Sequence, residues 1–209
     1  MRLDYERDGG AIYTASFATI RREADLSVVD AELESTAVRI IHACGDIDIV
    51  RHIQASSDFV QSARQALNAG RTIWCDSNMV VQGITRARLP ANNRVCCTLR
   101  DDGIAEDAVA AGNTRSAVAV DRWIDDLNGA VAVIGNAPTA LFRLLELVLE
   151  GVAKPAAIIG IPVGFIGAAE SKMALATMAH NIPYLTVHGR RGGSAMAAAA
   201  VNALASSKE

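Results

Sequence analysis

The sequence predicts an α/β fold with a mainly parallel sheet that helices cover on both faces. Three short apolar segments carry this prediction: residues 131–134, 156–159 and 184–187. Each segment runs into a turn that contains glycine, and the turns are separated by the length of a strand, a loop and a crossover helix. Strands that are apolar at nearly every position are buried on both faces, as in the parallel sheets of α/β proteins.

The first third of the chain is predicted to be helical. We expect helices over residues 10–24, 30–44 and 59–69. Asp30 is the expected N-cap of the second helix, and Gly45 is its expected stop.

Two further strands, residues 72–75 and 94–99, are predicted before the three apolar segments. No linker or low-complexity tract interrupts the pattern, so residues 1–209 are predicted to form one domain. The remaining helices are expected after Asp76-Ser77, after Asn113 or Thr114, and from Pro138, about Ala168 and about Ser194.

Composition and charge narrow the classes of function. The chain is 51% hydrophobic and 21% charged, which is enough apolar sequence for a real core. Its net charge of −3 argues against a general basic surface for nucleic acid or for an anionic membrane. Residues 1–8 are charged and lack the apolar stretch of a signal peptide, and no apolar stretch is long enough to span a bilayer. We therefore predict a cytoplasmic protein that binds neither membranes nor nucleic acid.

The four cysteines, at positions 44, 75, 96 and 97, form no C-x-x-C pair and no zinc-ligand pattern with histidine. They predict reduced thiols and no metal site.

Glycine-rich segments follow three of the predicted strands, at residues 135–139, 160–167 and 189–194. Ligands of open α/β sheets bind at the carboxyl ends of the strands, and helix N-termini favour anions. The segments therefore predict an anion site, although glycines that merely form tight turns are the alternative. The pattern G-x-G-x-x-G is absent, which argues against a dinucleotide.

His42 is the most informative of the histidines. At 100° per residue it lies about 180° from Leu33, away from the apolar stripe of its predicted helix. It also falls in the last turn, where the helix dipole stabilises an imidazolium. The position suits a proton donor, and a solvated histidine at a helix end is the alternative. His188, at the end of a predicted strand, is a second candidate.

Several arginines stand near the glycine segments or at predicted helix starts. Arg115 falls in the first turn of a helix, where a cation opposes the dipole and needs another reason to be there. Guanidinium groups bind carboxylates in bidentate fashion, and a solvated surface charge is the alternative for each residue. The set comprises Arg86, Arg88, Arg115, Arg190 and Arg191.

A set of motifs resembles those of the precorrin-8X methylmutase family. The motifs occur in the same order as in that family, and they cover essentially the whole chain. The motifs are AIYxxSF at residues 11–17, IHACG at 41–45, GxTR at 83–86, GNTRS at 112–116, GNAPTAL at 135–141, PVGF at 162–165, AAESK at 168–172 and GGSA at 192–195.

The resemblance implies a three-layer α/β/α sandwich that works as a homodimer, with the site near the subunit interface. It implies a tetrapyrrole substrate, transfer of the methyl group on C-11 of precorrin-8X to C-12 to give hydrogenobyrinic acid in corrin biosynthesis, and no cofactor. It makes His42 the proton donor to the ring. The residues that the resemblance and the motifs together place against the substrate are Ser16, Thr85, Arg86, Arg115, Asn136, Gly192, Gly193 and Ser194.

Other functions remain open at this point. One alternative is a cobalt-precorrin-8 methylmutase, and another is a tetrapyrrole-binding protein without turnover. A third is an unrelated α/β enzyme that acts on a phosphorylated or acyl ligand.

Overall fold

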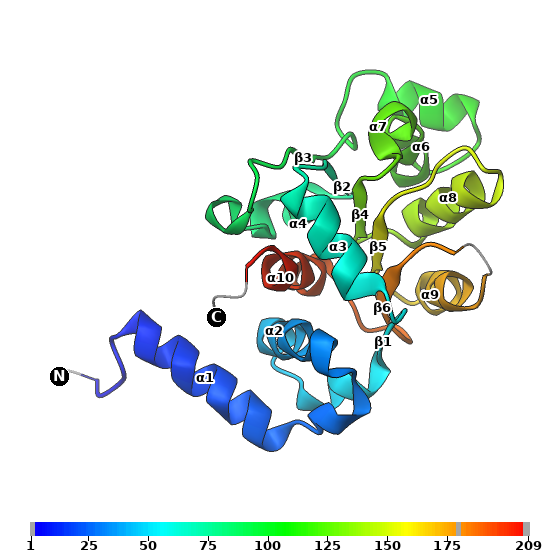
Figure 1. Ribbon diagram of the computed structural model, residues 1–209. Coiled ribbons are helices and arrows are strands. Elements are labelled where there is room, and N and C mark those ends of the chain that lie inside the picture. The colour runs from blue at the N-terminus through cyan, green and yellow to red at the C-terminus, as the bar shows by residue number, and fades with distance from the viewer. Residues whose placement is uncertain (1–2, 179–180, 207–209) are drawn as a thin grey trace.

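The computed structural model describes residues 3–178 and 181–206. Within these ranges the chain forms one six-stranded sheet with the order β1-β6-β5-β4-β2-β3 (Figure 1). Every neighbouring pair is parallel except β1 and β6, so the prediction of a mainly parallel sheet is confirmed. The strands are β1 (Ile53–Ala55), β2 (Ile73–Cys75), β3 (Val95–Cys96), β4 (Val131–Ile134), β5 (Ala157–Gly160) and β6 (Tyr184–Val187).

Helices cover both faces of the sheet. Successive residues of a strand point to opposite faces, so each strand contributes to two cores. In β4, Val131 and Val133 belong to one core cluster, whereas Ala132 and Ile134 belong to the other. The first core is built with α2 (Glu34–Cys44), α3 (Phe59–Asn68), α4 (Asn78–Gly83) and α10 (Ser194–Ala205). The second is built with α6 (Arg115–Asp121), α7 (Ile124–Leu127), α8 (Pro138–Leu149) and α9 (Ala168–Thr177).

The N-terminal helices extend the first layer outward. α2 packs mainly against α10, and α1 (Gly9–Glu23) packs against α2. α1 projects from the body of the molecule in Figure 1, and Phe17 and Ile20 are its buried residues. α5 (Ile104–Ala110) packs against α6 on the other side of the molecule. The 3-10 helices are η1 (Leu26–Val28), η2 (Ala31–Leu33), η3 (Ile47–His52) and η4 (Arg86–Arg88).

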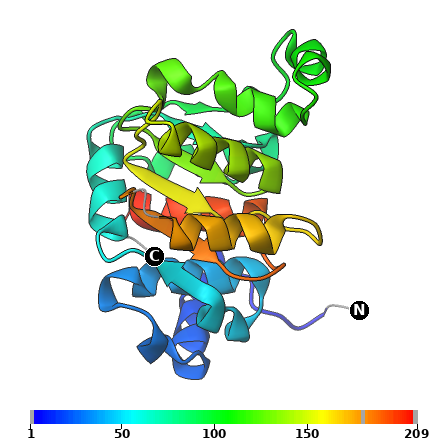
Figure 2. The same ribbon diagram turned by 90° about the vertical axis from the view of Figure 1, so that its right-hand side faces the viewer.

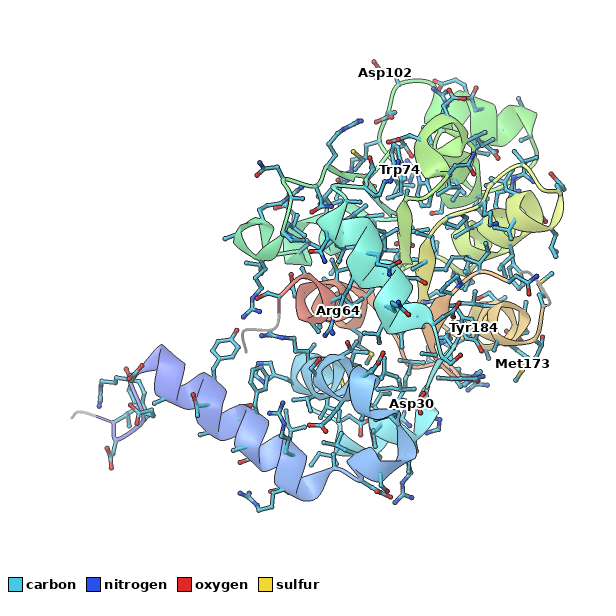
Figure 3. The ribbon with its side chains drawn as sticks, viewed as in Figure 1. Asp30, Arg64, Trp74, Asp102, Met173 and Tyr184 are labelled. Atoms are coloured by element: carbon cyan, nitrogen blue, oxygen red, sulfur yellow. The ribbon has the colours of Figure 1, made fainter. Side chains whose placement is uncertain are left out.

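The structure corrects several predicted boundaries. Asp30 precedes the 3-10 helix η2 and makes no capping hydrogen bond, so α2 starts only at Glu34. The predicted strand over residues 94–99 is reduced to β3, because Thr98 leaves the sheet. Its hydroxyl donates to the carbonyl of Ala119 at 2.7 Å and accepts the indole N–H of Trp123 at 2.9 Å. The helix expected from residue 114 is divided into α6 and α7 around the buried Trp123, which stacks on Trp74, labelled in Figure 3.

The parallel strands end at one edge of the sheet, which lies to the right in Figure 2. After β2 the chain forms β3 on one side of β2, and it then returns to form β4 on the other. This reversal between β2 and β4 is where α/β sheets place their ligands. No helix in the described ranges is both long and apolar enough to cross a membrane.

Candidate active site

His42 lies in the last turn of α2 and is hydrogen bonded to Ser16 of α1. The distance between Ser16 Oγ and His42 Nδ1 is 2.9 Å. Gly45 ends the helix in the left-handed conformation, with φ 66°, so the imidazole stands at the negative end of the helix dipole. The imidazole is exposed, whereas Leu33 and Ile40 are buried. His42 therefore lies off the buried stripe as predicted, and Ser16 is its partner.

Two aromatic rings of α1 hold the imidazole. The ring centroid of His42 lies 5.3 Å from that of Tyr13 and 5.1 Å from that of Phe17, which it meets edge to face. When the imidazole is protonated, Nδ1–H donates to Ser16 Oγ, and Nε2–H is the proton left to give away. The arrangement thus fixes both the orientation of the ring and the nitrogen that serves a ligand.

A surface hollow of about 330 Å³ lies against α1. It is bounded by Tyr13 and Phe17, the two rings that contact His42, and by Arg88 from η4. The hollow combines aromatic surface with one guanidinium group, which suits a flat ring that carries carboxylates.

The C-terminal end of α2 lies at the same edge of the molecule as the glycine-rich loops. Asp46, just after α2, forms an ion pair with Arg191 in the loop that precedes α10. Because the loop follows β6 and α10 starts from it, His42 belongs to the carboxyl edge of the sheet.

The loop after β4 does not present free amides to a ligand. The carboxylate of Asp76, at the end of β2, accepts the N–H groups of Gly135, Asn136 and Ala137 at 2.9, 2.9 and 2.7 Å. The expectation that these amides bind an external anion is therefore wrong. Burial raises the pKa of Asp76, and the three amide donors oppose that shift. The local sequence around Asp76 indicates only a possible helix cap, so this role of its carboxylate was not predicted. Asn136 keeps only its exposed side chain for a ligand.

The predicted residues of the last glycine segment shape the N-terminus of α10. Ser194 is buried, and its hydroxyl lies 3.1 Å from that of Ser77, so it is a packing contact within the protein. Gly193 has φ 128°, a region that favours glycine. A Cβ on Gly192 would lie 2.5 Å from the carbonyl oxygen of Pro162 and 2.6 Å from that of Ile161, so glycine is needed for the close approach of the two loops.

The remaining predicted residues occupy two other parts of this region. The hydroxyl of Thr114 contacts that of Thr139 in the first turn of α8 at 2.7 Å, and the next residue, Arg115, is exposed. Thr85 donates its N–H to Asn202 in the second half of α10. Arg86 contacts the carbonyl of Val95 at 3.4 Å. Thr85 and Arg86 thus lie along α10 from Ser194, and the structure describes no contact between them and His42.

Two further hollows could also hold a ligand, and they lie at opposite edges of the sheet. One of about 310 Å³ lies between residues 163–165 and 190–192 at the carboxyl edge. A wider depression of about 820 Å³ lies at the opposite edge, where Gly129, Ala156 and Pro183 precede the strands. None of the predicted site residues lines that depression, and ligands of such sheets bind at the carboxyl ends. The site is therefore assigned to the carboxyl edge.

All four cysteines are free thiols, as predicted. Burial raises the pKa of Cys75 well above its usual value. Residues 3–178 and 181–206 contain no group of three or more His, Cys, Asp or Glu side chains arranged to hold a metal ion.

Comparison with known proteins agrees with this architecture. The family model described as CbiC, precorrin-8X methylmutase, matches residues 11–207. A precorrin-8X methylmutase from Pseudomonas aeruginosa is 58% identical over 99% of this chain and 100% of its own length. One from Sinorhizobium sp is 58% identical over 97% of this chain and 96% of its own length. Proteins named cobalt-precorrin-8 methylmutase are more distant, for example one from Salmonella typhimurium that is 41% identical over 82% of this chain and 80% of its own length.

A solved structure shows the same fold. The crystal structure titled as a precorrin-8X methylmutase from Thermus thermophilus superimposes with a TM-score of 0.85 and 33% identity. The match covers 94% of this chain and 95% of that one. The chain therefore belongs to the precorrin-8X methylmutase family.

Proposed function

We propose that this chain moves the methyl group on C-11 of precorrin-8X to C-12, giving hydrogenobyrinic acid, and that His42 is the proton donor. The predictions of the family and of a methylmutase enzyme are confirmed by the relatives described above. The observation that supports the role of His42 is its geometry: an exposed imidazole held by Ser16 at 2.9 Å and by the rings of Tyr13 and Phe17.

The proposed chemistry needs few groups. The bond from the methyl group to C-11 breaks and the bond to C-12 forms within one molecule, so no second substrate is consumed. Protonation of the macrocycle by Nε2–H of His42 promotes this shift, and the proton must return because the reaction is an isomerisation. A general acid contributes about 10²–10⁴-fold. Holding the ring in its reactive shape contributes the rest.

The carboxylates of the substrate are assigned to arginine side chains rather than to backbone amides. The amides of residues 135–137 are bonded to Asp76. Arg88 lines the hollow beside Tyr13 and Phe17, and Arg190 lines the hollow at residues 163–165 and 190–192. Guanidinium groups match carboxylates in geometry and charge, which explains how a chain of net charge −3 binds a polyanion.

The metal-free substrate is favoured over the cobalt-bearing one. Relatives named precorrin-8X methylmutase are 58% identical to this chain, and the Salmonella protein named for the cobalt substrate is 41% identical.

The test is to mix the purified protein with precorrin-8X and to follow the visible spectrum for the orange product. Tight binding without conversion would favour the cobalt substrate or a carrier without turnover. A protein that neither bound nor converted precorrin-8X would rule out the proposal.

Arg115→Ala is expected to weaken product binding by about tenfold, the equivalent of one hydrogen bond to a charged group, with a smaller effect on kcat. The reason is that Arg115 contributes a guanidinium group to the carboxyl edge. The measurement is a titration with hydrogenobyrinic acid followed by absorbance. Arg64→Ala on α3, which is labelled in Figure 3 and lies away from α6, is the matched control. An unchanged affinity of Arg115→Ala would remove its assigned role.

A homodimer is also proposed, and exposed apolar residues at the carboxyl edge support it. Phe165 and Ile166 are 83% and 91% exposed in the single chain, which is unusual for large apolar neighbours. Light scattering after size exclusion should therefore give twice the chain mass of 22.0 kDa. Ile166→Asp should shift the protein toward the single-chain mass, while Met173→Asp on the exposed face of α9 should not. A wild-type mass of 22.0 kDa would contradict the dimer.

Location in the cytoplasm stays a prediction.

A further inference from the structure

Lys172 of α9 is a fully buried lysine, with 0% of its surface exposed. Its Nζ donates to the backbone carbonyl of Arg191 at 2.7 Å. In the described part of the chain this carbonyl is its one hydrogen-bond partner, and no carboxylate pairs with it. Burial lowers the pKa of Lys172 to about 8, so the group is still mostly charged at neutral pH.

A buried ammonium without a counter-ion is costly, and the effective penalty is several kcal/mol. A methionine would fill nearly the same space without that penalty. The lysine is therefore not explained by packing alone, and its charge or its hydrogen bond to Arg191 is the feature to account for.

The hydrogen bond fastens the loop over residues 189–193 to α9. Two backbone contacts fasten the same loop to residues 161–164, which precede α9: Gly164 N–H donates to the carbonyl of Arg190 at 3.2 Å, and Gly193 N–H donates to that of Ile161 at 2.9 Å. Lys172 supplies the only side chain among these three contacts. It holds the backbone carbonyl of Arg191, the residue that follows Arg190.

The surroundings of Lys172 favour an anion. His188, just after β6, donates its N–H to the carbonyl of His52 at 2.8 Å. Its pKa is lowered by burial and then by the charges of Lys172 and His52. The loop carries two guanidinium groups. That of Arg191 forms an ion pair with Asp46, and that of Arg190 has no carboxylate partner among the described residues. Arg190 lies over the ring of Phe165, 5.6 Å from its centroid. Both residues line the hollow of about 310 Å³.

We propose that Lys172 is a positioning residue, which holds the loop over residues 189–193 so that Arg190 receives one carboxylate of the substrate in this hollow. The inference rests on the proposed function, because it takes the polycarboxylate tetrapyrrole as the ligand. Lys172 itself is enclosed and acts through the Arg191 carbonyl and through its charge.

Lys172→Met tests the proposal. We expect KM for precorrin-8X and the dissociation constant of hydrogenobyrinic acid to rise about tenfold, the loss of one charge-assisted interaction. We expect kcat to stay close to that of the wild type and the unfolding midpoint to stay equal or rise, because a buried charge is replaced by an apolar side chain. Lys154→Met, which removes an exposed lysine at the opposite edge, is the control for charge.

The pH dependence separates positioning from packing. The folded-state pKa of Lys172 is lowered from 10.5 to about 8. The wild type should therefore lose affinity for hydrogenobyrinic acid as pH rises through about 8, while its stability relative to Lys172→Met rises between pH 8 and 10.5. Lys172 contacts the backbone carbonyl of Arg191, whose side chain is paired with Asp46. His188 is the titratable group coupled to Lys172, and its pKa is lowered from 6.5, so it titrates below this window.

The outcomes are distinct. An unchanged KM and a flat pH profile, in a wild type that converts precorrin-8X, would overturn the role of Lys172 and leave the proposed function intact. A wild type without turnover or binding would instead overturn the proposed function. If Lys172→Met lowered the unfolding midpoint and kcat together, Lys172 would be a packing residue only. If that variant did not fold, the wild-type pH profile would still decide.

Discussion

Replacing His42 with alanine is expected to lower kcat by about 10²–10⁴-fold, the usual contribution of a general acid. The affinity for hydrogenobyrinic acid should stay nearly unchanged, because the imidazole is assigned to proton donation rather than to binding. Ser16 and the rings of Tyr13 and Phe17 would remain in place. The measurement is the initial rate of conversion of precorrin-8X from the visible spectrum, together with a titration of the product.

His52→Ala is the matched control for this variant, because His52 is a half-exposed histidine that ends η3. It should convert precorrin-8X at the wild-type rate. Turnover by His42→Ala at the wild-type rate would exclude His42 as the acid. A large loss of product affinity in His42→Ala would show instead that the imidazole binds the ring.

Much of this site was predictable from local sequence, because the relevant signals act within a single helix. The apolar spacing around Leu33, Ala37 and Ile40 placed His42 on the other side of α2, and Gly45 marked the helix end. The hydrogen bond to Ser16 was not predictable, since the two residues are 26 positions apart and meet only because α1 packs across α2.

In the fold, too, the elements with a strong local pattern were predictable, and those that depend on tertiary contacts were not. The apolar segments of β4, β5 and β6 predicted buried parallel strands, and the sheet confirms them. β1 escaped prediction because it is short, carries the polar Gln54 and exists through its antiparallel pairing with β6. α5 escaped because its apolar contacts are few, with Ile104 and Ala108 as its buried residues.

The part of the site that sequence reasoning described wrongly concerns the loop after β4. Three amides at a glycine before a helix have the local signature of an anion cradle. In the structure the carboxylate of Asp76, the residue after β2, fills this cradle. No local sequence pattern predicts that Asp76 lies beside Gly135. The topology explains the contact, because β2 and β4 are neighbours at the reversal of strand order.

Asp76→Ala is expected to lower the free energy of unfolding by roughly 2–5 kcal/mol, because each buried donor left without a partner costs about 1–3 kcal/mol. The amide of Gly135 is enclosed, whereas those of Asn136 and Ala137 are partly accessible, so water replaces part of the loss. Urea unfolding followed by circular dichroism measures the change. Asp76→Asn should fall between wild type and Asp76→Ala, because an asparagine keeps one oxygen as acceptor and turns its NH₂ group against another donor.

Asp125→Ala, which removes an exposed carboxylate from α7, is the control and should change the unfolding free energy by less than about 0.5 kcal/mol. Equal stability of Asp76→Ala and wild type would mean that water satisfies the three amides and that Asp76 is not needed to close this loop. Binding of an added carboxylate such as acetate at the loop of Asp76→Ala would show instead that the three amides form an anion cradle, which Asp76 occupies in the wild type. In the wild type these three amides are bonded to Asp76, so we assign the substrate carboxylates to the arginine side chains instead.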